Sequence, residues 1–117
     1  MNDPDVKEVP VTMPDFVLSA VARGHLLALT GRLDVHAAAD VRQALADAVD
    51  EGLGDLVLDL SAVRAVDATG LGVLVSAHRR AGRAGRTLVL RDVPEQVGRV
   101  LRVTRLDRVL HQDGMVA

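Results

Sequence analysis

Leu56-Val57-Leu58-Asp59-Leu60, followed shortly by Asp67-Ala68-Thr69-Gly70-Leu71-Gly72-Val73-Leu74, is the stretch that decides the fold. The apolar run predicts a buried strand, and the octet with its glycines predicts a tight turn that opens a helix. Asp67 and Thr69 place a carboxylate and a hydroxyl beside the unpaired N–H groups of that helix. Since a helix N-terminus favours negative charge, a phosphate there would be accommodated while changing the surface that a partner meets. The turn therefore predicts a switch more readily than a catalytic centre.

The apolar spacing before this stretch predicts a hairpin and a helix. Phe16–Val21 and Leu26–Leu29 flank Arg23-Gly24, a pattern typical of two antiparallel strands. The next apolar residues recur at intervals of three and four, which predicts an amphipathic helix that Gly52 and Gly54 end. Its inner line is Val41, Ala44, Leu45, Ala48 and Val49.

The second half of the chain alternates strands and helices. The strand centred on Val57 reads as buried on both faces, which predicts a central, parallel position. A helix begins near Gly70, Thr87–Leu90 forms a short strand, and Pro94 opens a final helix. The predicted inner lines of these two helices are Leu71, Leu74, Val75 and His78, then Val97, Val100, Leu101 and Thr104.

This element order predicts the fold class. Strand, strand, helix, strand, helix, strand, helix indicates a single α/β domain. Its mixed central sheet starts with the antiparallel hairpin and continues with parallel strands, and the helices pack against it through right-handed crossovers.

Composition narrows the class of protein. A chain of 117 residues fits one domain, and 49% hydrophobic with 26% charged residues is typical of a soluble globular protein. Fourteen basic and sixteen acidic residues give a net charge of −2, so no overall field attracts nucleic acid or an anionic membrane. The absence of cysteine excludes disulfides, thiolate nucleophiles and cysteine-ligated zinc.

Residues 1–10 are acidic and contain two prolines, which predicts a flexible N-terminal tail and leaves 11–117 as the domain. They lack the basic start and apolar stretch of a secretory signal. No apolar run is long enough to cross a bilayer, so we expect no membrane segment. The expected location is the cytoplasm.

No pattern of an enzyme stands out. Gly70-Leu71-Gly72 lacks the third glycine of a dinucleotide-binding loop, since that position holds Val75. Gly85-Arg86-Thr87 has arginine where a Walker-type phosphate loop requires lysine. We therefore expect no enzyme, no cofactor and no metal. None of the four histidines has a metal-ligand spacing to another histidine or a carboxylate: His25, His36, His78 and His111.

Arginine is abundant near two helix ends. The pattern fits either a nucleic-acid surface or a solvated face that complements the negative helix C-termini. Phe16 is the only Phe, Tyr or Trp of the chain, so there are too few aromatic side chains for nucleic-acid bases to stack on. We therefore expect no direct nucleic-acid binding. The clusters are Arg79, Arg80, Arg83 and Arg86, then Arg99, Arg102, Arg105 and Arg108.

At this point the sequence resembles a known family. The octet from Asp67 to Leu74 is similar to the Asp-Ser-Ser/Thr-Gly-Leu-Gly signature of STAS domains, the anti-sigma factor antagonists (anti-anti-sigma factors) of bacteria. Gly31-Arg32-Leu33-Asp34 resembles the Gly-x-Leu-Asp element before the family's first helix. The element order agrees as well, so the resemblance covers nearly the whole chain. It implies a STAS fold and a partner-binding set of Asp34, Asp67, Ala68, Thr69, Gly70 and Leu71.

The resemblance also implies a function, partner switching in transcription. Such an antagonist binds an ATP-dependent anti-sigma kinase and frees a sigma factor. The kinase phosphorylates the serine after the signature aspartate, and a phosphatase reverses this. Here that position is Ala68, and Thr69 holds the only hydroxyl in the turn. Either the protein binds constitutively, beyond the kinase's control, or Thr69 takes over as the acceptor.

Alternatives accompany this reading. Asp67 and Thr69 also suit helix capping, and Asp34 is either a partner-facing carboxylate or a local cap. Leu71 is either an apolar contact for a partner or a buried residue. STAS-like domains also serve as accessory subunits of lipid-transport ATPases and as parts of stress-signalling assemblies. The partner found in the native cell would distinguish these functions.

Overall fold

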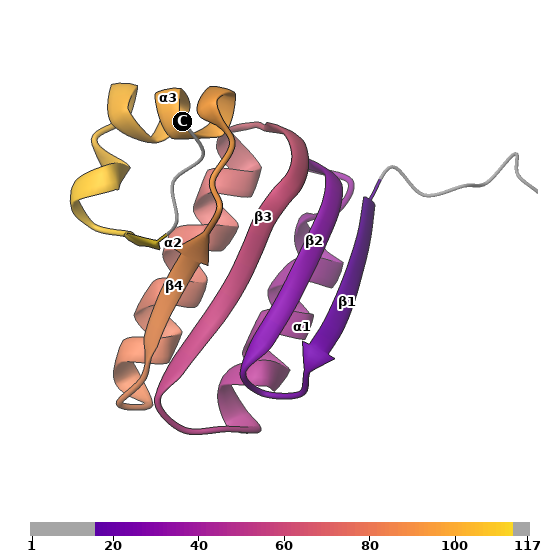
Figure 1. Cartoon of the computed structure of the whole chain (residues 1–117), viewed down its shortest axis with the longest axis vertical. Coiled ribbons are helices and arrows are strands. Elements are labelled where there is room, and N and C mark those ends of the chain that lie inside the picture. The colour runs from indigo at the N-terminus through magenta and orange to yellow at the C-terminus, as the bar shows by residue number, and fades with distance from the viewer. Residues whose placement is uncertain (1–15, 114–117) are drawn as a thin grey trace, which may run out of the picture.

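The structure, a computed structural model, describes residues 16–113 (Figure 1). The predicted tail, and the domain boundary predicted at residue 11, lie outside these residues. Five strands form one sheet in the order β1-β2-β3-β4-β5. The elements are β1 Phe16–Ala22, β2 Leu26–Leu33, α1 Ala38–Asp50, β3 Asp55–Val66, α2 Ala68–Arg83, β4 Thr87–Arg91, α3 Glu95–Val103, the 3₁₀ turn η3 Leu106–Arg108 and β5 His111–Asp113.

The sheet is mixed, as the sequence predicted. β1 pairs antiparallel with β2 and places Leu18 opposite Leu29, which confirms the hairpin. The remaining neighbours are parallel, and Leu58 of β3 lies beside Leu27 of β2 and Leu90 of β4. The central, parallel position predicted for the strand around Val57 is therefore confirmed.

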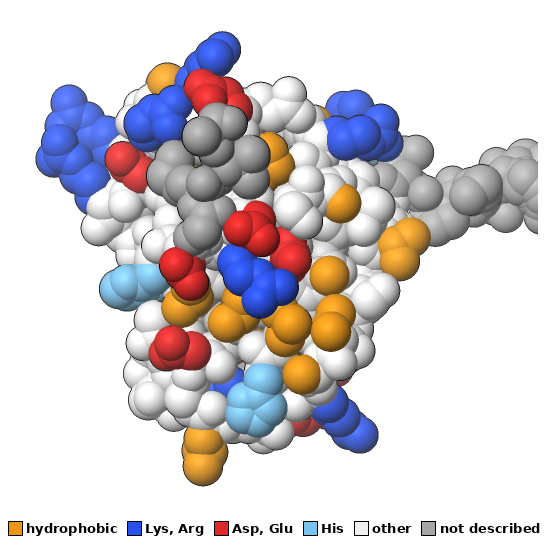
Figure 2. Space-filling model, in the orientation of Figure 1, with side chains coloured by type: hydrophobic (Ala, Val, Ile, Leu, Met, Phe, Trp, Pro, Cys, Tyr) orange, Lys and Arg blue, Asp and Glu red, His pale blue; other side chains and the backbone are white. Residues whose placement is uncertain are grey.

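Only one face of the sheet is covered by α1 and α2, which lie behind it in Figure 1. Leu56, Leu58 and Leu60 point to that side and are fully buried. Val57 and Asp59 point the other way and are only half-buried. The prediction of burial on both faces was wrong, because the apolar run supplies alternating side chains to one core. Figure 2 shows the open face, where hydrophobic side chains gather below and to the right of a central cluster of basic and acidic ones.

The inner line of α1 is confirmed, with Val41 and Leu45 fully buried and Ala44 at its margin. The line predicted for α2 is partly wrong, since Val75 and His78 are only half-buried. The helix packs against both α1 and the sheet, so its buried face is displaced toward other small and aliphatic residues. The buried residues of α2 are Gly70, Leu71, Val73, Leu74, Ala77 and Ala81.

The chain after α3 contains two elements that the sequence did not indicate, η3 and β5. Thr104 was predicted to face inward but is exposed, and its hydroxyl donates to the carbonyl of Val100 at 2.8 Å. Arg105 then reverses the chain with a positive φ of 64°. His111 can pair with Val89 at the sheet edge once the chain has turned back. Three residues are too few to show a strand period.

Arg86 is the largest departure from the sequence prediction. It was placed among the surface arginines, but only 5% of it is exposed. Its guanidinium donates to the carbonyls of Ala48 at 2.8 Å and Val49 at 3.0 Å, at the end of α1. It also donates to the carbonyls of Gly24, Gly54 and Asp55. One side chain thus joins the β1–β2 turn, the end of α1 and the start of β3.

Asp59 lies on the open face and holds two donors. Its carboxylate accepts from the Ser61 N–H at 2.8 Å and from Arg91 Nη2 at 3.0 Å. Burial raises the pKa of Asp59, but the hydrogen bonds from Ser61 and Arg91 outweigh it and hold the pKa below its ordinary value. A carboxyl whose pKa is lowered by folding stabilises the fold above its unfolded pKa of about 4. This stabilisation is lost as pH falls through the folded pKa.

We expect Asp59→Asn to lower the free energy of unfolding at pH 7 by about 0.5–1 kcal/mol, because the ion pair is partly exposed. At pH 3, below the unfolded pKa, the loss of stability in the variant should be smaller. Urea midpoints at both pH values measure this. Asp107→Asn, which removes an exposed carboxylate from η3, is the control and should leave the pH dependence intact. An equal loss for Asp59→Asn at both pH values would contradict the linkage.

Candidate functional site

The turn between β3 and α2 lies where the parallel strands β2 and β3 both end. Asp67, Ala68 and Thr69 are exposed there. Gly70 is buried and Leu71 is 9% exposed. The predicted site residues of this turn therefore form two groups. Asp67, Ala68 and Thr69 form an accessible rim, and Gly70 and Leu71 lie buried beneath it.

Asp67 is the N-cap of α2 and also holds the neighbouring loop. One carboxylate oxygen accepts from the Gly70 N–H at 2.8 Å. The other accepts from the Val35 N–H at 3.2 Å, in the loop between β2 and α1. Capping by Asp67 is thus confirmed. The expected capping by Thr69 was wrong within residues 16–113, where its hydroxyl forms no hydrogen bond.

Gly70 lets α2 begin directly against the end of β2. A Cβ atom at this position would lie 2.1 Å from the Leu33 carbonyl oxygen and 2.9 Å from Leu33 Cγ. The same carbonyl accepts from the Asp67 N–H at 3.2 Å. Only glycine fits this approach without moving backbone, whereas a Cβ at Gly72 would meet open space. Gly70 therefore supports the rim and does not form part of it.

Asp34 organises the loop that faces the turn. Its Oδ1 accepts from the N–H groups of His36 at 3.0 Å and Ala37 at 3.3 Å, and Arg32 Nε lies 3.5 Å from its Oδ2. Burial raises the pKa of Asp34, but the hydrogen bonds from His36 and Ala37 outweigh it and leave the pKa below its ordinary value. Asp34 therefore stabilises the loop before α1. The alternative that it caps this helix is wrong, since the N-cap of α1 is Ala37 and no side chain forms a capping bond there.

Val35 is a surface residue that the sequence reasoning missed. It is 60% exposed, and its N–H is bound to Asp67. The sequence signal for Val35 was an aliphatic residue directly after the Gly-x-Leu-Asp element. It belonged to no regular spacing of apolar residues and was therefore passed over. We use the name switch edge for the exposed residues of the loop and the turn together, which are Val35, His36, Asp67, Ala68 and Thr69.

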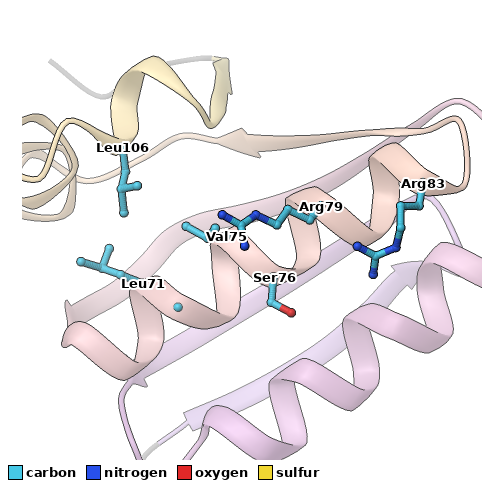
Figure 3. A pocket seen from close by; sticks show the side chains of 7 residues that line it. Leu71, Val75, Ser76, Arg79, Arg83 and Leu106 are labelled. Carbon is cyan, nitrogen blue, oxygen red and sulfur yellow. The ribbon is translucent and has the colours of Figure 1, made fainter.

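A groove begins beside the switch edge and runs along α2 (Figure 3). It has a volume of about 520 Å³. Leu106 of η3 forms the wall opposite Leu71, so the groove lies between α2 and η3. The other residues along it are Gly72, Val75, Ser76, Arg79 and Arg83.

The exposed part of the turn offers one carboxylate, one methyl group and one hydroxyl, from Asp67, Ala68 and Thr69. Within residues 16–113, no three histidine or carboxylate side chains gather as metal ligands. None of the helices in the described part of the chain is both long enough and apolar enough to span a membrane. Fold and site together define the class: an α/β domain that presents a short aliphatic and hydroxyl-bearing edge at the start of a helix.

Comparison with known proteins gives the family. The sequence model described as "Mlab, STAS domain" matches residues 17–116. The chain belongs to the STAS domain family, as the two sequence elements indicated. An anti-sigma-B factor antagonist from Staphylococcus epidermidis is 30% identical over 81 residues, which cover 69% of this chain and 75% of the relative.

Solved structures share the fold. An anti-sigma factor antagonist from Mycobacterium paratuberculosis has a TM-score of 0.73 at 23% identity, covering 86% of this chain and 87% of its own. An anti-sigma-factor antagonist (STAS) domain protein from Planctomyces limnophilus has a TM-score of 0.69 at 16% identity, covering 88% of this chain and 92% of its own. The name of the Staphylococcus epidermidis relative describes a regulator and not an enzyme, in agreement with the expectation that this chain is not an enzyme.

Proposed function

We propose that this protein is an anti-sigma factor antagonist of the cytoplasm that binds an anti-sigma kinase through the switch edge and thereby releases a sigma factor. The observation that carries the proposal is the exposure of Asp67, Ala68 and Thr69 on a turn that Asp67 holds rigidly against the Val35 loop. A preformed, accessible edge binds without the cost of ordering a loop. The regulatory names of the relatives support the same role.

We further propose that the usual serine phosphorylation does not control this protein. The position after the signature aspartate is Ala68, which is exposed but carries no hydroxyl. Thr69 is also exposed, but it is the second residue of α2. Its side chain therefore leaves the helix in a different direction from that of Ala68. A kinase that fits the first position would have to reposition the turn to reach the second. The protein is then a constitutive binder that needs no phosphatase.

The test combines the cognate kinase, ATP and intact-mass measurement. The wild type should bind the kinase equally well with and without ATP and should gain no phosphate. Ala68→Ser should gain one phosphate and lose binding when ATP is present, because the added charge of about −2 sits on the contact edge. Ala68→Ser with Thr69→Ala is the matched control and should behave as Ala68→Ser does.

Two results would contradict the proposal. A stoichiometric phosphate on Thr69 of the wild type would make Thr69 the acceptor and remove the constitutive reading. Affinity purification from the native cell is the second arm, in which we expect a kinase of the histidine-kinase ATPase superfamily. Recovery of a membrane transport ATPase or of a stress-signalling assembly in its place would favour the accessory-subunit function.

A further inference from the structure

The groove along α2 has two chemically different ends. Leu71, Val75 and Arg79 follow one another at intervals of four and so lie on one face of the helix. In Figure 3, Leu106 approaches this face over Leu71, while the side chains of Arg79 and Arg83 lie toward the other end of α2. The apolar end adjoins the switch edge, and the basic end lies toward the C-terminus of α2.

The two arginines of the groove lack a counterion within the described chain. Neither Arg79 nor Arg83 forms an ion pair among residues 16–113, whereas the adjacent Arg80 lies 3.5 Å from a carboxylate oxygen of Asp50. The whole chain has a net charge of −2, so it does not attract acidic molecules in general. The two arginines make a local basic surface, which would attract an acidic group of a partner to this end of the groove.

The shape of the groove favours a helix as the occupant. The α2 segment from Leu71 to Arg83 spans about 18 Å at 1.5 Å per residue, which is a little over three helical turns. A helix lying along it would place apolar side chains against Leu71, Val75 and Leu106. Carboxylates one turn apart would then meet Arg79 and Arg83, which are themselves one turn apart.

We infer that this groove receives an acidic amphipathic helix of the same protein partner that contacts the switch edge. The inference rests on the proposed function, since Leu71 makes the groove continuous with that edge. A nucleic-acid strand is disfavoured because no aromatic side chain lines the groove and stacking contributes much of such binding. The partner would therefore contact two adjoining surfaces. It would fit the switch edge by shape and would bind the basic end of the groove by charge.

Calorimetry with the full chain and the cognate kinase tests this inference. Arg79→Glu with Arg83→Glu should weaken binding at least about tenfold, and the wild-type affinity should fall with added salt. Arg23→Glu with Arg99→Glu makes the same change in net charge at exposed residues outside the groove and should stay within about twofold of the wild type.

The outcomes separate the two proposals. Thr69→Glu places a carboxylate on the exposed switch edge and should abolish binding if the proposed function holds. Unchanged affinity in the groove variant, together with loss of binding in Thr69→Glu, would overturn the acidic-helix inference and leave the proposed function standing. No binding of the kinase by the wild type would overturn both. An equal loss in the groove variant and in its charge-matched control would reduce the effect to net charge and overturn the inference as well.

Cross-linking identifies the acidic segment directly. Lys7 is the only lysine of the chain, so Arg79→Lys adds a nearly unique amine while keeping the positive charge. A carbodiimide joins amines to nearby carboxylates, and mass spectrometry then locates the link. We expect the introduced lysine to link to aspartate or glutamate residues one turn apart in the kinase. Links to the kinase from Lys7 alone would overturn the inference.

Discussion

Gly70→Ala is expected to lower the free energy of unfolding by about 3 kcal/mol, at the upper end of the range for overpacking. The added Cβ would lie 2.1 Å from the Leu33 carbonyl oxygen, which is backbone and cannot rotate away. Either α2 or the end of β2 must shift, and both carry the switch edge. The Asp67 N–H bond to the same carbonyl would be strained by that shift.

Gly72→Ala is the matched control two residues along the same helix. A Cβ at Gly72 meets nothing within 4 Å, so alanine should raise the free energy of unfolding by about 0.5–1 kcal/mol through helix propensity. Urea unfolding followed by far-ultraviolet circular dichroism measures both variants. Equal effects of the two substitutions would show that helix propensity, and not the approach to Leu33, decides the role of Gly70.

The second large effect is expected at Arg86. Arg86→Met keeps an unbranched side chain, although a shorter one, and removes every donor, leaving the carbonyls of Ala48, Val49 and Gly24 without that partner. Each buried polar group left without a bond costs about 1–3 kcal/mol, and water relieves part of this, so we expect a loss of roughly 3–4 kcal/mol. Urea midpoints give the value.

Two controls define the cause. Arg86→Lys keeps the charge but offers three donors in place of five, so its loss should be intermediate. Arg83→Met removes an exposed arginine three residues away and should change stability by less than about 0.5 kcal/mol. A loss at Arg86→Met no larger than at Arg83→Met would refute the structural role of the buried guanidinium.

The sequence predicted the elements whose apolar residues repeat with a clear period. The hairpin was recognised because its two strands are close in the chain, and α1 was recognised because its apolar residues recur at intervals of three and four. The central parallel strand was recognised from its apolar run. β5 could not be recognised, since it exists only through its pairing with Val89 and its neighbours on β4. The open face was also missed, because continuous apolar sequence does not reveal how many layers cover a strand.

The candidate site was accessible from sequence only in part. Asp67 caps the helix that follows it, which is a local need that the sequence shows. The need for glycine at position 70 comes instead from the approach of α2 to the Leu33 carbonyl of β2. Val35 and the groove at Leu106 depend on which loops tertiary packing brings to the start of α2. Arg86 was misplaced because its acceptors are backbone carbonyls of segments far away in the chain. Every residue has such a carbonyl, so the sequence does not show which of them will bind a side chain.

Arg86 and the switch edge lie at opposite ends of the parallel strands. The guanidinium joins segments where β3 begins, and Asp67 follows the residue where β3 ends. A substitution in the switch edge therefore touches none of the hydrogen bonds that Arg86 makes at the other end of β3. A residue such as Ala68 can therefore differ from the serine of the resembled signature without disturbing the end of the sheet that Arg86 secures.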